Sequence, residues 1–91
     1  MEMNMAYNLE AIRHLLDEAF DAEEIAQLAY DRFYALYAEF TAATSKSRMI
    51  DAVVKYTNKN GRIPDLFDYI QENSPYYYQE YADKLKNSSI D

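Results

Sequence analysis

Cysteine is absent from this chain, and glycine and proline are almost absent, with one and two residues respectively. The lack of cysteine excludes a disulfide framework and a zinc site built on thiolates. So few turn-forming residues also argue against a sandwich or barrel of many short strands, which needs a turn after every strand. These absences favour a fold made of long helices.

Signatures of catalysis and ligand binding are missing as well. The one histidine, His14, lies in an apolar periodic stretch without a cysteine or an evident partner. No phosphate-binding loop or EF-hand spacing surrounds the one glycine. Adjacent acids such as Glu23 and Glu24 fit the first turn of a helix, where the macrodipole stabilises them. We therefore predict that the chain is not an enzyme and has no catalytic residue, metal site or cofactor.

Targeting and membrane signals are not visible either. Residues 1–8 have neither a basic nor an apolar signal-peptide region, and no apolar run approaches the roughly 18 residues that span a bilayer. The 91 residues, 49% of them hydrophobic, suffice for one domain with a thin core. We expect one soluble, cytoplasmic domain over residues 1–91, with a folded core at about 8–86 and frayed residues 87–91.

Apolar residues recur at three- and four-residue spacing, which predicts an all-α fold. The pattern indicates helices at about 8–20, from 22 onward, from 45 or 47 to 59, at 64–73 and at 75–86. Asn8 and Asp21 are suitable N-caps, and Glu24 completes a capping box with Asp21. Residues 34–40 either continue the second helix or form a separate short turn. The connections are short, so we predict a compact antiparallel bundle of five to six helices.

Two residues have a structural role at the boundary between the third and fourth predicted helices. Gly61 follows Asn58-Lys59-Asn60 and is expected in the left-handed conformation just past the helix end. Pro64 is expected in the first turn of the next helix, where its missing N–H costs nothing.

Charge is divided along the chain, although the net value is −7. Residues 1–40 carry nine acids and two bases (net −7), residues 41–62 carry five bases and one acid (net +4), and residues 63–91 carry six acids and two bases (net −4). The acidic balance argues against nucleic acid as the partner. The basic segment is therefore the most distinctive feature of the sequence.

On a helix, Arg48, Lys55 and Lys59 line one side, and Arg62 follows just past the end. This basic face is either an ordinary solvated surface or a surface that docks on an acidic protein. Acids of that kind gather around the junction of the first two helices: Asp17, Glu18, Asp21, Glu23 and Glu24.

The chain contains ten tyrosines, too many for so small a core to bury. Tyrosine combines a large apolar body with a polar tip, which suits protein interfaces. The candidate interface aromatics are Tyr30, Tyr34, Tyr76, Tyr77 and Tyr78. The alternative is that they pack partly buried, with their hydroxyls in water.

The order of these elements resembles the effector-associated domains of prokaryotic conflict systems, also described as bacterial death-like domains. The resemblance covers about residues 9–78 and is carried by Leu9-x-x-Ile12-x-x-Leu15-Leu16-x-x-Ala19-Phe20, Ile25-x-x-Leu28, Tyr37-x-x-Phe40, Ser47-Arg48-Met49-Ile50-x-x-Val53-Val54-x-Tyr56 and Asn60-Gly61-Arg62-Ile63-Pro64-Asp65-Leu66-Phe67-x-x-Ile70-x-x-Asn73-x-Pro75. It implies a death-fold-like bundle, usually of six helices. It also implies an adaptor that pairs with a like domain and brings an effector to a sensor, in a bacterial defence or cell-death system.

Two functions are therefore open at this level. The first is a non-catalytic adaptor whose partner is a protein, a related death-like domain, with a homo-oligomer or filament as a possible product and with no nucleic acid or membrane involved. The second is a stand-alone acidic inhibitor that mimics nucleic acid or blocks an enzyme. The basic face distinguishes them, because a nucleic-acid mimic gains nothing from a cluster of positive charge.

Overall fold

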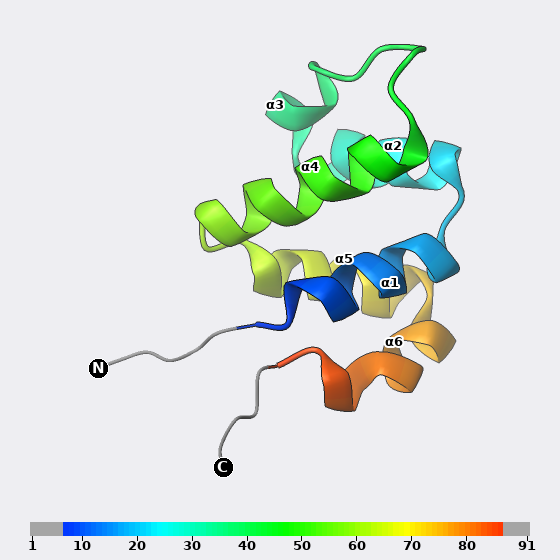
Figure 1. Cartoon of the computed structure of the whole chain (residues 1–91), viewed down its shortest axis with the longest axis vertical. Helices are drawn as coiled ribbons and strands as arrows, with labels where there is room; N and C mark the ends of the chain where they lie inside the picture. Colours follow the sequence, from blue (N-terminus) through cyan, green and yellow to red (C-terminus); the bar gives the residue numbers. More distant parts are fainter. Residues whose placement is uncertain (1–6, 87–91) are drawn as a thin grey trace.

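The computed structural model describes residues 7–86, which form an all-α bundle (Figure 1). Its helices are α1 (Leu9–Ala19), α2 (Ala22–Arg32), α3 (Tyr34–Tyr37), α4 (Lys46–Lys59), α5 (Ile63–Asn73) and α6 (Pro75–Tyr81), followed by the 3₁₀ turn Ala82–Lys84. The described part contains no strand, only an isolated antiparallel bridge between Tyr7 and Lys86. The all-α prediction is confirmed. The predicted fraying of residues 87–91 lies outside the described residues.

Local sequence sets most of the helix starts. The Asn8 side chain accepts a hydrogen bond from the Ala11 N–H at 3.1 Å, and Ser45 caps α4 by accepting from the Arg48 N–H at 3.2 Å. Asp21 and Glu24 form the predicted capping box, with both bonds at 2.9 Å. These bonds satisfy N–H groups that have no partner within the helix.

Gly61 ends α4 as predicted, with φ of +67°. The Arg62 N–H donates to the Thr57 carbonyl at 2.7 Å and the Gly61 N–H to the Asn58 carbonyl at 3.5 Å, which is the Schellman arrangement. Pro64 lies in the first turn of α5, again as predicted.

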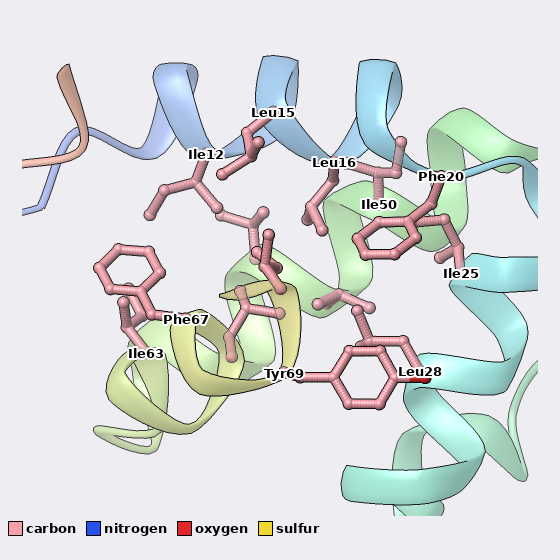
Figure 2. Close-up of a cluster of buried hydrophobic side chains, with 14 of the residues drawn as sticks. Ile12, Leu15, Leu16, Phe20, Ile25, Leu28, Ile50, Ile63, Phe67 and Tyr69 are labelled. Atoms are coloured by element: carbon pink, nitrogen blue, oxygen red, sulfur yellow. The ribbon is translucent and has the colours of Figure 1, made fainter. Parts of the chain in front are cut away.

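α4 lies at the centre of the bundle and packs against α1, α2, α3 and α5, while α6 packs against α1 and α5. α3 and α6 lie at opposite ends of the longest axis (Figure 1). The core is one apolar cluster, in which Ile12, Leu15 and Leu28 are fully buried (Figure 2). None of the described helices is both long and apolar enough to cross a membrane.

Two boundaries differ from the prediction. Residues 34–37 form their own short helix, so the open question about residues 34–40 is answered in favour of a separate element. The predicted helix over 75–86 is wrong in its last part, since α6 ends at Tyr81 and a 3₁₀ turn follows. The tighter turn precedes Leu85, which is buried and accepts a hydrogen bond from the Asn8 N–H at 2.8 Å.

Candidate interaction surfaces

An open groove of about 920 Å³ lies between α1 and α4. Charges of both signs line it, from Glu10 and Arg13 on α1 to Asp51 and Lys55 on α4. His14 also lies at this groove, exposed, with Nε2 3.6 Å from Glu10 Oε2. Among residues 7–86, no group of three or more histidines or acids could hold a metal ion. The groove is open to solvent and is lined by surface ion pairs.

Of the basic face, Arg48, Lys55 and Lys59 are exposed on α4. Lys55 already has an ion-pair partner, since its Nζ lies 3.1 Å from Asp51 Oδ2. Asp51 also pairs with Arg13, whose Nη2 lies 3.1 Å from Asp51 Oδ1. The hydrogen bond from Lys55 lowers the pKa of Asp51, with Arg13 adding to the effect against the opposing desolvation. Within the described residues, Arg48 and Lys59 have no ion-pair partner.

Arg62 does not belong to the basic face in the folded chain. The turn at Gly61 takes it across to α2, where its guanidinium carbon lies 5.0 Å from the Phe33 ring centroid. Its Nε donates to Asp65 Oδ2 at 2.6 Å. Arg62 is thus half-buried and paired within the chain, while its predicted role in an interaction surface stays a prediction.

The acidic face is largely occupied by contacts within the chain. Asp17 forms an ion pair with Lys46, whose Nζ lies 3.2 Å from Asp17 Oδ1 and donates a hydrogen bond to the Asp17 carbonyl at 2.7 Å. Asp21 and Glu24 form the capping box. Tyr81 lies beside Glu18, and burial followed by the hydrogen bond to Glu18 raises the pKa of Tyr81. All five acids remain exposed. Glu23 is the one member that has no ion pair or hydrogen bond within the described part of the chain.

The candidate tyrosines divide into two exposed groups and one packing residue. Tyr30 and Tyr34 contact each other and Tyr37 at the α3 end of the bundle. Tyr76 and Tyr77 form an edge-to-face pair on α6, at the opposite end. Tyr78 is half-buried against Phe67, with the ring centroids 5.9 Å apart, so it packs on the core while its role as an interface residue stays a prediction.

Tyr37 was missed as a member of the first group, although a signal was present. Positions 30, 34 and 37 follow the four- and three-residue spacing of one helical side. Here that spacing keeps the rings together even though α2 ends at Arg32 and α3 begins at Tyr34.

A protein-family model described as effector-associated domain 7 matches residues 12–75, which include α2 to α5 and most of α1. No curated protein matches the chain. No solved structure matches it either.

Proposed function

Because the chain belongs to the effector-associated domain 7 family, we propose that it is a non-catalytic adaptor domain that associates with a like domain and thereby couples a sensor to an effector. In this role it works in the cytoplasm of a bacterium, within a defence or cell-death system. Its partner in this proposal is a second copy of this domain.

The observation that carries this proposal is the presence of opposite charges that no contact within the described chain neutralises. Arg48 and Lys59 extend from α4, and Glu23 extends from α2 beside exposed tyrosines. A domain with both signs on separate helices can bind another copy of itself through unlike surfaces. The free cations on α4 also disfavour a nucleic-acid mimic.

Charge alone gives this association little free energy. An exposed ion pair contributes about 0–1 kcal/mol and weakens as salt shortens the screening length. A stable contact therefore needs an apolar or aromatic centre as well, and the exposed tyrosines can supply one.

The test is sedimentation equilibrium of the purified domain over a wide concentration range. At about 0.01 M salt, where the Debye length is about 30 Å, the wild type should self-associate, and at about 1 M it should dissociate. Arg48→Glu with Lys59→Glu should remove the association at low salt. Lys84→Glu with Lys86→Glu reverses the same number of charges outside the basic face and should leave the association intact. A wild type that stays monomeric at low salt contradicts the proposed function.

A further inference from the structure

Three tyrosine rings build one exposed aromatic cluster on α2 and α3, defined here as the tyrosine cluster: Tyr30, Tyr34 and Tyr37. The Tyr30 centroid lies 5.5 Å from that of Tyr34 and 5.2 Å from that of Tyr37, and the Tyr34 and Tyr37 centroids are 5.7 Å apart. Tyr30 is 51% and Tyr34 60% exposed. The rings thus lie against one another while much of their surface faces water.

The environment of the tyrosine cluster favours a positive ligand. Glu23 lines the same shallow hollow as Tyr30 and Tyr37, together with Gln27. The faces of tyrosine rings carry negative potential and attract ammonium and guanidinium groups within about 6 Å. A carboxylate at the edge of such rings adds to this attraction.

Elsewhere the chain places its own cations on aromatic rings. Arg32 lies 5.2 Å from the Tyr69 centroid, Arg62 5.0 Å from that of Phe33, and Lys84 Nζ 5.5 Å from that of Tyr81. Within residues 7–86 no cation lies over any ring of the tyrosine cluster. The cluster is therefore an aromatic site whose cation has to come from another molecule.

The chain itself offers a suitable group on a different surface. Arg48 is exposed and has no ion pair within the described part, and it lines the α1–α4 groove and the hollow next to residues 39–44 rather than the hollow at the tyrosine cluster. A planar guanidinium stacks on aromatic rings and pairs with a carboxylate at once, which an ammonium does less well.

We propose that the tyrosine cluster, with Glu23 at its edge, receives the Arg48 guanidinium of a second copy of this chain. This inference rests on the proposed function and names the two surfaces that meet. In the proposed contact the two surfaces meet head to tail, with the donor of one copy on the receiver of the next. The assembly then grows into a ring or filament, whereas a reciprocal two-fold dimer, in which each copy supplies both a donor and a receiver, would stop at two copies.

Head-to-tail contacts can be tested by mixing two variants that each lack one surface. Tyr30→Ala with Tyr34→Ala removes the receiver and keeps Arg48, whereas Arg48→Glu removes the donor and keeps the receiver. Each variant alone should be monomeric at concentrations where the wild type assembles. An equimolar mixture should form a 1:1 complex and nothing larger, because only one productive contact remains.

Matched substitutions separate ring stacking from general effects. Tyr30→Phe with Tyr34→Phe keeps the rings and should retain association. Arg48→Lys keeps the charge without the planar group and should weaken association by about tenfold, which corresponds to 1.4 kcal/mol. Tyr76→Ala with Tyr77→Ala removes the exposed pair at the other end and should leave association unchanged. Far-UV circular dichroism and thermal melting confirm that each variant is folded.

The outcomes distinguish this inference from the proposed function. Wild-type association that survives Tyr30→Ala with Tyr34→Ala, or equal loss with Tyr76→Ala and Tyr77→Ala, overturns the tyrosine cluster as the receiver and leaves the adaptor proposal standing. A mixture of the two folded variants that stays monomeric overturns the head-to-tail pairing alone. A monomeric wild type at low salt overturns both.

Discussion

The two sides of α2 carry the same types of residue, but the charged and aromatic groups are paired with a neighbouring helix on one side and exposed on the other. On the side facing α5, Tyr69 donates a hydrogen bond to Asp31 at 3.1 Å, and Arg32 lies over the Tyr69 ring while pairing with Glu72 at 3.0 Å. On the α3 side, the tyrosine cluster has rings in contact but no cation of the described chain over them. Aromatic and charged residues on α2 thus stabilise the fold where a neighbouring helix pairs with them, and remain exposed where none does.

The largest expected effect is on the α5 side, at Phe33, which is 1% exposed and lies under Arg62. Phe33→Ala removes a buried ring and should lower the free energy of unfolding by about 3–5 kcal/mol. That loss is a large part of the total for a domain of this size. Urea unfolding followed by circular dichroism measures it. Phe33→Leu, which retains an apolar side chain, should lose less, and an equal loss would show that the stabilisation depends on the ring itself rather than on apolar burial.

The next largest expected effect is the dependence of stability on pH, which we attribute to Tyr69. Burial, followed by the hydrogen bond to Asp31, raises the pKa of Tyr69 from 10.0 to about 12. The folded chain keeps this proton when the unfolded chain has lost it, so the stabilisation is complete below pH 10 and is lost as the pH rises towards about 12. At 1.36 kcal/mol per pKa unit, the change is on the order of 2–3 kcal/mol.

Urea unfolding across this range, with wild type and Tyr69→Phe compared, tests the assignment. The burial-raised pKa values of Tyr78 and Tyr81 contribute to both proteins alike, so the difference between the two curves isolates Tyr69. The variant should show a smaller fall with pH, and parallel curves would remove Tyr69 as the cause.

A smaller effect is expected at Gly61, which directs Arg62 onto Phe33. No atom lies within 4 Å of a Cβ built at this position, so a substitution is strained through φ alone. Gly61→Val should cost about 1–3 kcal/mol in unfolding free energy. Gly61→Asn should cost less, because asparagine tolerates the left-handed region. The melting midpoints of the three proteins measure this, and an unchanged midpoint for Gly61→Val would contradict it.

The smallest effect on stability is expected in the tyrosine cluster itself. Tyr34 is 60% exposed, so Tyr34→Ala should change the free energy of unfolding by no more than about 0.5 kcal/mol. Thermal melting of the dilute, monomeric protein gives this value. A loss approaching that of Phe33→Ala would show that the tyrosine cluster is part of the core.

Much of the fold could be predicted from local patterns. The apolar residues at positions 25, 28, 29 and 33 recur at helical spacing and are buried, as are those at 49, 50, 53 and 54. The caps at Asn8 and Asp21 and the stop at Gly61 depend on residues within a few positions of one another. The α6 boundary could not be predicted in this way, because Leu85 is buried through contact with the start of the chain.

The candidate surfaces were predicted less completely. Exposed charge on α4 followed from helical periodicity, and the acids around the α1–α2 junction followed from their clustering in the sequence. The exposure of Tyr30 and Tyr34 followed from a number of tyrosines that is too large for so small a core. Helical periodicity and composition did not predict which of these charged groups have a partner within the chain. Asp17 meets Lys46 across 29 positions in sequence, and Arg13 meets Asp51 across 38.

The sequence by itself determined the helices, their buried faces and the helix stop, because periodicity, capping and backbone conformation act over three to five residues. Tertiary structure decided which charged and aromatic side chains are satisfied within the chain. Arg62 lies on Phe33 instead of on the basic face, and four of the five acids have partners inside the domain. Within the described residues, Arg48 has no ion-pair partner and no cation lies over the tyrosine cluster. The physical reason is that an ion pair or a cation over a ring needs contact within a few ångströms, and only the packing of one helix on another sets such distances.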